Sequence, residues 1–336
     1  MATLKEIAQA AGVSLTTVSN VVNGNYHRVS SDTVERIQSL IRQSGYVPNQ
    51  AARSLAQRES RIIAVIVQAI ENENIFRNPY TAEYVGALTV ELYKNGYFPL
   101  IRYTDDYRDV EGDLRGWNVA GAIFSGAYSR HLKNIKSLTT MPTVFTDCYF
   151  RIPGINHVGV DDEAGGQMAA EYLAGMGHRR MAFVANSIEE SEVDQHRLLG
   201  FRAELADRGI TLPDQCVIPT PANIYNPQTL QELMRRDAPS AIFCTSDRVA
   251  AQLVQALHLL GYRVPEDVSV LGFDNLPLAE LTHPPLSTLA QDINQKAKLV
   301  VDMLMRHIRQ KDLPPERTLL GVWLVERSSV RRYEEG

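Results

Sequence analysis

The first 48 residues place apolar side chains at the spacing of short helices. Thr3 followed by Glu6 fits a capping box, in which a hydroxyl and a carboxylate each bond a backbone amide at a helix start. Gly12 supplies the turn that ends this helix, Ser14 caps a second one, and a third is expected from Ser30. The predicted inward positions are Leu4, Ile7, Ala8 and Ala11, then Val18, Val21 and Val22, then Val34, Ile37, Leu40 and Ile41.

Two short helices joined by a turn of about three residues are typical of a helix-turn-helix, whose second helix enters the major groove of DNA. The same pattern also fits an ordinary helical bundle. Residues 49–58, NQAARSLAQR, carry a further helical stripe, but about ten residues are too few for a stable isolated helix. This segment therefore needs a partner.

From residue 61 the pattern changes to short apolar runs that alternate with helical segments, one of them near residues 84–95. Such alternation favours parallel sheets covered by helices on both faces, and two series of runs predict two similar lobes. Ligands of such sheets collect beyond the carboxyl ends of the strands, which predicts a site between the lobes. The first series is 62–67, 98–103, 119–124 and 142–147, and the second is 157–161, 181–186, 216–220, 241–246 and 268–273.

Several stretches resemble one family of proteins. LKEIAQAAGVSLTTVSNVVNG, VSSDTVERIQ and GYVPNQAARSL are similar to the DNA-binding head and hinge helix of the lactose-repressor (LacI/GalR) family of bacterial transcription regulators. MGHRRMAFVA, RLLGFRAEL, AIFCTSDRVAAQLVQAL, VPEDVSVLGFDN and PPLSTLAQD resemble the effector-binding body of that family. The resemblance covers nearly the whole chain.

The resemblance implies an all-α helix-turn-helix head with a hinge helix, followed by an α/β body of two parallel-sheet lobes like those of periplasmic sugar-binding proteins. It also implies a last long helix near 293–310 and a final strand near 319–325. Because no leucine heptads follow, we expect a homodimer rather than a tetramer. The implied boundaries are 1–48 for the head, 49–60 for the hinge helix and linker, and 61–336 for the body, with lobes of 61–160 plus 293–320 and 161–292 plus 321–330.

The resemblance also assigns DNA contacts. Leu15, Thr16 and Asn20 match the positions that reach base edges, and Leu55 of the hinge helix matches a leucine that wedges into the minor groove. Many members carry arginine where this chain has Asn20, so we expect an adenine contact in place of a guanine contact. The hinge contacts include Asn49 and Ala52. The expected phosphate contacts, each of which could instead be a solvated side chain, are Thr3, Lys5, Ser14, Thr17, Asn23 and Arg28.

Effector contacts are carried over in the same way. Arg197 and Asp274 match groups that bond ligand hydroxyls, with surface salt bridges as the alternative. Asp147 matches another polar contact, and Tyr80 matches an aromatic that packs on the ligand. Ser246 and Asp247 open a helix and could face the site, although Asp247 equally fits a charge that stabilises a helix start. The segment 107–118 is shorter than is usual in the family, so we expect the first-lobe wall of the effector site to differ from that of other members.

Composition and charge limit the other possibilities. The 336 residues are 44% hydrophobic and 22% charged, which is typical of folded domains, and a mildly basic first 60 residues precede an acidic remainder. Three scattered cysteines predict neither a disulfide nor a zinc site, and the acidic segment 105–113 lacks calcium-loop spacing. We therefore expect no metal and no cofactor. No signal peptide or membrane-spanning run is predicted, which indicates a cytoplasmic protein without a membrane partner.

These observations predict a sequence-specific DNA-binding regulator, most often a repressor in this family, that binds a pseudo-palindromic operator as a homodimer. We expect its operator affinity to be controlled by a small effector, with a sugar or sugar derivative as the first choice. The alternatives are control by a purine, a nucleoside or a protein partner. A sugar-transport protein or an enzyme fits less well, because neither explains the head and no GxxxxGK[ST], HExxH or GxSxG motif is present.

Overall fold

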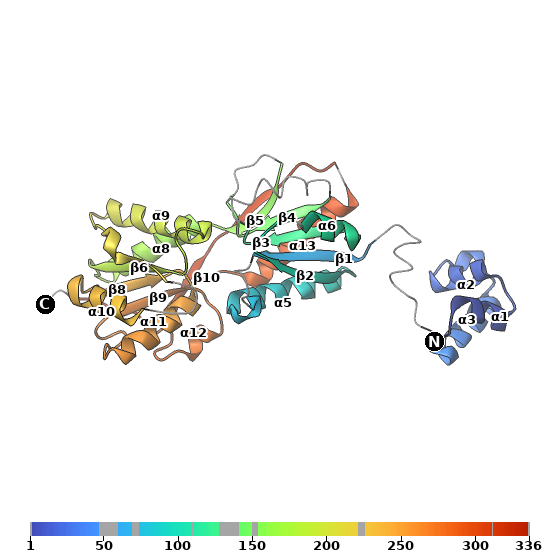
Figure 1. The fold of residues 1–336 in the computed structure, drawn as a ribbon, viewed down its shortest axis with the longest axis horizontal. Coiled ribbons are helices and arrows are strands. Elements are labelled where there is room, and N and C mark those ends of the chain that lie inside the picture. Colours follow the sequence, from blue (N-terminus) through green and yellow to red (C-terminus); the bar gives the residue numbers. More distant parts are fainter. Residues whose placement is uncertain are drawn as a thin grey trace. The chain divides into compact units, whose positions relative to one another are not determined.

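The computed structural model describes residues 2–46, 60–68, 74–108, 110–127, 141–149, 154–220, 226–310 and 312–334. The chain divides into two compact units, Met1–Ser60 and Arg61–Gly336 (Figure 1). The expected hinge helix, with Asn49, Ala52 and Leu55, lies outside the described residues. Within the described parts of the chain, no helix is long and apolar enough to cross a membrane.

The first unit consists of three helices around a small apolar core, as predicted. Thr3 and Glu6 form the expected capping box, Gly12 adopts a left-handed φ of 64° after the first helix, and Ser14 caps the second. The core contains Ile7, Val18, Val21 and Ile37. The elements are α1 (Leu4–Ala11), α2 (Leu15–Val22), the short 3₁₀ helix η1 (Tyr26–Arg28) and α3 (Ser31–Ser44).

The first lobe of the second unit is a parallel sheet with the strand order β11-β5-β4-β3-β1-β2. Because side chains alternate along a strand, Ile63 and Val65 of β1 pack on α5 and α13, whereas Ala64 and Ile66 pack on the side of α6. The strands are β1 (Ile62–Gln68), β2 (Phe98–Thr104), β3 (Gly121–Ser125), β4 (Thr143–Thr146), β5 (Asn156–Val160) and β11 (Arg317–Leu320). The helices are η2 (Ile75–Arg77), α5 (Pro79–Lys94), α6 (Val110–Gly116) and α13 (Ile293–Arg309).

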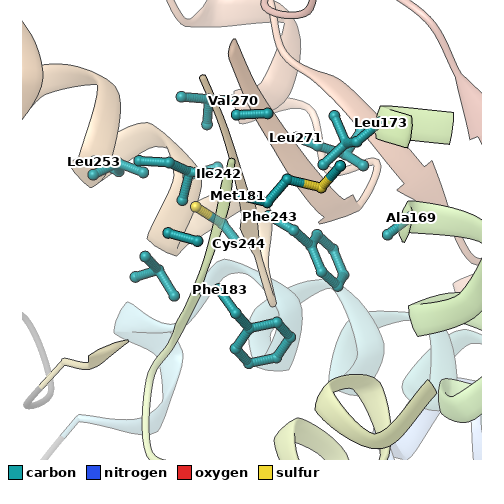
Figure 2. Close-up of a cluster of buried hydrophobic side chains, with 14 of the residues drawn as sticks. Ala169, Leu173, Met181, Phe183, Ile242, Phe243, Cys244, Leu253, Val270 and Leu271 are labelled. Atoms are coloured by element: carbon teal, nitrogen blue, oxygen red, sulfur yellow. The ribbon is translucent and has the colours of Figure 1, made fainter. Parts of the chain in front are cut away.

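The second lobe repeats this plan with the strand order β12-β10-β9-β8-β6-β7, in which β12 is antiparallel to β10. Phe243 of β8 lies 5.2 Å from Phe201 of α9 between ring centroids, while Ile242 points toward Leu253 of α11 (Figure 2). The strands are β6 (Met181–Ala185), β7 (Val217–Pro219), β8 (Ala241–Cys244), β9 (Ser269–Asp274), β10 (Ser287–Ala290) and β12 (Trp323–Val325). The helices are α8 (Asp162–Gly175), α9 (Glu192–Asp207), η5 (Asp214–Cys216), α10 (Pro227–Arg236), α11 (Asp247–Leu259) and α12 (Leu278–Leu281).

Three sequence-based expectations about elements were wrong in detail. The run 157–161 was expected to open the second series, but it forms β5 of the first sheet, and the chain enters the second lobe only after Val160. The single final strand expected near 319–325 is two strands, β11 and β12, which pair in different sheets on either side of Gly321. The helix expected from Tyr84 begins at Pro79, because Asn78 caps it and proline is favoured in a first turn.

The chain crosses between the lobes after β5, after β10 and between β11 and β12. Each crossing lies near the carboxyl ends of the central strands, so the residues that follow β4, β8 and β9 share this region. The two-lobed α/β fold predicted from the sequence is confirmed.

Candidate functional site

The outer surface of α2 carries the side chains expected to reach DNA bases. Leu15 is 52% exposed, Thr16 is exposed and Asn20 is partly exposed, while Val18 and Val21 of the same helix are buried in the core. An exposed leucine at the start of a helix suits apolar contact with a thymine methyl group. The second helix of a helix-turn-helix is the element that presents such side chains to the major groove.

Several of the expected phosphate contacts also build the helix ends. The Thr3 hydroxyl accepts a bond from the Glu6 amide at 3.3 Å, and the Ser14 hydroxyl accepts one from the Thr17 amide at 3.1 Å. Ser14 and Thr17 share a second bond between their hydroxyls at 2.8 Å. Because each cap uses the hydroxyl as an acceptor of the amide, the Thr3 hydroxyl keeps its own hydrogen for a phosphate. Arg28 is exposed, and the Asn23 amide donates to Ser19.

The second unit gathers charged side chains at its lobe crossings. On the first-lobe side, the Lys296 ammonium donates to the Tyr80 hydroxyl at 2.7 Å and also bonds Asp147. The Tyr80 hydroxyl donates to the other Asp147 oxygen at 3.1 Å. Burial opposes the charge on Asp147, but the Lys296 ammonium holds the pKa of this carboxyl below its ordinary value. The structure therefore brings together Tyr80 and Asp147, which the sequence analysis named separately as expected effector contacts.

On the second-lobe side, Arg197 of α9 is buried and bonds several protein groups. Its Nε and a terminal nitrogen both bond one Asp162 oxygen, at 2.8 and 2.7 Å, and it also donates to the Thr245 carbonyl. The guanidinium lies over the Phe273 ring, 3.4 Å from the centroid. Burial would lower the pKa of Arg197, but the Asp162 carboxylate raises it above its ordinary value.

Asp274, at the end of β9, lies within electrostatic reach of both cations. It accepts a bond from the Gln291 amide at 2.6 Å and is almost completely buried. Burial raises the pKa of its carboxyl to about 8, although Arg197 and Lys296 both oppose the shift. Its φ of 109° is one that side chains rarely adopt, which is the kind of strain that persists at functional sites. Asp274 is thus bonded to Gln291 and is influenced electrostatically by both Arg197 and Lys296.

A tyrosine links the two lobes beside Arg197. Tyr149, which follows β4 of the first lobe, donates its hydroxyl to Asp162 and its backbone amide to Glu192 of α9 at 3.2 Å. Its ring stacks on His196 with centroids 3.8 Å apart. Asp162 therefore bonds Arg197 through one oxygen and a first-lobe side chain through the other.

Ser246 and Asp247 are used within the second lobe. The Ser246 hydroxyl caps α11 by accepting the Val249 amide at 3.2 Å. Asp247 accepts from the Thr288 hydroxyl at 2.6 Å and the Leu276 amide at 2.7 Å, tying α11 to the loop after β9 and to β10. Burial raises the pKa of Asp247 to about 6. These contacts favour the structural alternative for Asp247 over ligand binding.

Sequence reasoning missed Lys296, Asp162, Gln291 and Tyr149. A signal for Lys296 was present, because it interrupts the apolar stripe of α13 formed by Ile293, Ala297 and Val300. Nothing in the local pattern marked the other three. Among the described residues, no group of three or more histidine, cysteine or acidic side chains could hold a metal ion.

Comparison with known proteins identifies the family. Residues 3–49 match the family described as "Bacterial regulatory proteins, lacI family", and residues 170–330 match the "Periplasmic binding protein-like domain". The ribose operon repressor of Haemophilus influenzae is 30% identical, over 98% of this chain and 99% of the relative. The chain belongs to the lacI family. It is therefore a DNA-binding transcriptional regulator, and this family consists of regulators rather than enzymes.

Other members of the lacI family resemble the chain over its full length. The HTH-type transcriptional repressor PurR of Mannheimia succiniciproducens is 28% identical over 99% of both chains. A crystal structure of the lac repressor dimer, bound to operator and the anti-inducer ONPF, has a TM-score of 0.87 and 26% identity, covering 98% of this chain and 99% of that one. A cellobiose complex of the regulator CelR has a TM-score of 0.73 and 28% identity, covering 98% of this chain and 100% of that one.

Proposed function

We propose that the chain is a homodimeric repressor whose affinity for a pseudo-palindromic operator is set by a small carbohydrate bound between its lobes. The observation that carries the proposal is the set of buried polar groups at the lobe crossings, in which Gln291 bonds Asp274, Lys296 bonds Asp147 and Tyr80, and Arg197 bonds Asp162. Carboxylates and a fixed guanidinium together suit hydroxyl groups, which both donate and accept hydrogen bonds. The proposed effector contacts are Tyr80, Asp147, Arg197 and Asp274. Because bacterial DNA lies in the cytoplasm, the protein would act there.

A purine is the second candidate effector. Two observations favour it: several relatives are named PurR, and the partly exposed ring of Tyr80, which stacks on buried Tyr84 with centroids 5.9 Å apart, is a surface on which a flat base could stack. A sugar fits the buried carboxylates better, because both Asp147 and Asp274 lie where hydroxyl donors would meet them.

On the DNA side, Leu15, Thr16 and Asn20 would read bases, while Thr3, Ser14, Thr17, Asn23 and Arg28 would contact phosphates. The hinge residues Asn49, Ala52 and Leu55 stay a prediction from the family resemblance. Asparagine pairs in bidentate fashion with adenine, whereas arginine pairs with guanine. Selection from a random DNA pool should return adenine at one position of each half-site for the wild type and guanine for Asn20→Arg. The same base for both proteins would contradict this role.

A second copy of the chain would cover the outer face of α5 and the edge strand β2. Exposed apolar side chains gather on these two elements: Val90, Tyr93, Phe98, Ile101 and Tyr103. Monomeric proteins seldom leave so many large apolar groups together on one surface, and an edge strand needs covering. The lac repressor structure to which the chain is similar is a dimer bound to its operator.

Effector control would follow from the difference in effector affinity between two lobe arrangements. Arg197 supports this, because Asp162 connects it to Tyr149 of the opposite lobe. A ligand that bonds Arg197 would therefore act on a contact that holds the lobes together.

A thermal-shift screen tests the effector, because a ligand of the native state raises its apparent stability. The panel contains free sugars, disaccharides, sugar phosphates, purines and nucleosides. We expect a neutral sugar to raise the melting temperature of the wild type but not of Arg197→Ala, while Arg202→Ala on the same helix responds like the wild type. Operator titration with and without the hit then gives the direction of control. A hit that Arg197→Ala retains would remove Arg197 from the site.

A further inference from the structure

Lys296 is a charged residue on the apolar face of α13 and is completely buried. Its ammonium lies 5.4 and 5.2 Å from the ring centroids of Tyr80 and Tyr84. Burying an ammonium is costly even when it is paired, and an apolar residue of similar volume often gives a more stable protein. A charge at this position therefore points to a role other than stability.

Two buried groups near the crossing after β10 have unused hydrogen-bonding capacity. The Lys296 ammonium has three N–H donors, and the described residues supply acceptors for two of them, on Tyr80 and Asp147. The Gln291 side chain is 7% exposed, and its carbonyl oxygen has no hydrogen-bond partner in the described structure. Unsatisfied buried polar groups are costly and rare, so one donor and one acceptor left open on the same connection between the lobes indicate a missing ligand.

The position of Gln291 and Lys296 joins both lobes. Gln291 donates to Asp274 at the end of β9, and Lys296 bonds Asp147 after β4. The connection from β10 to α13 therefore supplies one donor to a strand-end carboxylate of each lobe. A ligand that meets both open groups would bind at this connection, whose other bonds reach both lobes.

We propose that Lys296 and Gln291 are specificity-determining residues that select an uncharged effector bearing adjacent hydroxyl groups. The inference rests on the proposed effector control. The ammonium of Lys296 donates to one hydroxyl oxygen, and the carbonyl of Gln291 accepts the hydrogen of a neighbouring hydroxyl. A phosphate or carboxylate ligand offers acceptors alone, leaves the Gln291 carbonyl unsatisfied and meets the negative charge of Asp147.

Calorimetric titration of the full-length protein tests this with D-ribose, D-galactose, D-glucose and cellobiose, and with hypoxanthine and ribose 5-phosphate as probes of other classes. The sugar that binds best is then compared with its monodeoxy analogues. We expect one analogue to bind the wild type about tenfold more weakly than the parent sugar, as for a lost bond to a charged group. In Lys296→Met, parent and analogue should bind within about twofold of each other, since the partner of that hydroxyl is gone.

Lys298→Met is the matched control, because Lys298 is exposed on the same helix and should keep the wild-type discrimination. Lys296→Met leaves Asp147 unpaired and could fail to fold for that reason. In that case the double variant Asp147→Asn with Lys296→Met, which removes both charges, is titrated in place of the single variant. Gln291→Leu should lose discrimination for a neighbouring hydroxyl.

Equal discrimination by wild type and Lys296→Met would overturn the inference. So would binding of hypoxanthine or ribose 5-phosphate, but of no neutral sugar, by the wild type. Binding to operator DNA obtained by selection is measured in parallel. Loss of discrimination that fails to appear in Lys296→Met, in a protein that binds operator and a neutral sugar, contradicts this inference alone. Protein that binds operator but no neutral sugar contradicts the proposed carbohydrate effector as well, and protein that binds neither contradicts the whole proposed function.

Discussion

At the scale of single residues, the crossing region shows how burial changes the chemistry of ordinary side chains. Asp147 and Asp274 both follow central strands, yet the pKa of Asp147 is lowered beside Lys296 while that of Asp274 is raised to about 8. The difference arises because Asp147 has a direct ammonium partner and Asp274 has a neutral amide. Two carboxyl groups at equivalent places in the two lobes therefore carry different charges near neutral pH.

The raised pKa of Asp274 gives a pH-dependent stability. An aspartate in the unfolded chain titrates near about 4, so between about pH 4 and about pH 8 the folded protein holds a proton that the unfolded chain releases. The free energy of unfolding should therefore fall as the pH rises through this window. In Asp274→Asn this contribution is absent, and the urea midpoint should change less between about pH 5.5 and about pH 8 than in the wild type.

Asp105→Asn, which changes an exposed carboxylate, should keep the wild-type pH dependence. An identical pH dependence in Asp274→Asn and wild type would show that Asp274 is ionised in the folded protein throughout the window.

The sequence predicted the candidate site unevenly, for a physical reason. Tyr80, Asp147, Arg197 and Asp274 could be named because the family resemblance carries them, and two of them proved to be bonded neighbours. Asp162 and Tyr149 could not, because their importance comes from contacts across the lobes, which leave no periodic signal in the chain. Asp247 was marked by the sequence, but its role was not, because an acidic residue at a helix start gives the same pattern whether its carboxylate faces a ligand or an internal hydroxyl.

At the scale of elements, α8 and α9 approach so closely that their glycines are required. A Cβ atom at Gly166 would lie 2.0 Å from the Arg197 carbonyl oxygen, and one at Gly200 would lie 1.9 Å from that of Glu163. The backbones touch where these two residues cross. This contact also fixes the backbone of Arg197, so the packing of the two helices positions the proposed effector site.

Gly166→Ala should therefore force the helices apart and lower the free energy of unfolding by about 1 to 3 kcal/mol, as overpacking does. Gly175→Ala is the matched control on the same helix, because nothing lies within 4 Å of its added Cβ, and it should leave stability unchanged or slightly higher. Urea unfolding of the three proteins measures both effects. Equal stabilities for the two variants would show that the helices separate without cost.

Elements were predicted best where their pattern is long and local. The three helices of the first unit could be placed from their caps and spacing, and the buried strands of both sheets from their apolar runs. β10 was missed because Ser287 and Thr288 leave it without a continuous apolar run, and β11 and β12 were merged because one apolar run continues across the crossing at Gly321. Whether these short segments form strands, and where each strand ends, depends on pairing with strands far apart in the sequence.

At the scale of the whole molecule, the exposed face on α5 and β2 should decide the assembly. Tyr93 is 72% exposed, so an aspartate there costs the isolated chain little but would place a charge in the proposed dimer interface. We expect Tyr93→Asp to sediment as a monomer at concentrations where wild type is a dimer. Operator affinity should fall as well, because a single head then engages only one half-site.

Leu199→Asp, on α9 of the second lobe, is the matched control, because Leu199 is an exposed apolar residue away from this face. It should remain a dimer. Dimers of Tyr93→Asp with wild-type stability would place the interface elsewhere.

The crossing between β11 and β12 also sets the order in which the protein can be completed during synthesis. The helices of the first unit are complete once the chain reaches Ser44. The first sheet receives its last strand only at Arg317–Leu320, and the second at Trp323–Val325. At the usual pace of translation the ribosome needs roughly ten to fifty seconds to make the intervening chain. During that time the nascent head has no finished lobe through which it could dimerise with a second copy. The growing chain therefore cannot bind both half-sites of an operator before its effector-binding lobes have been made.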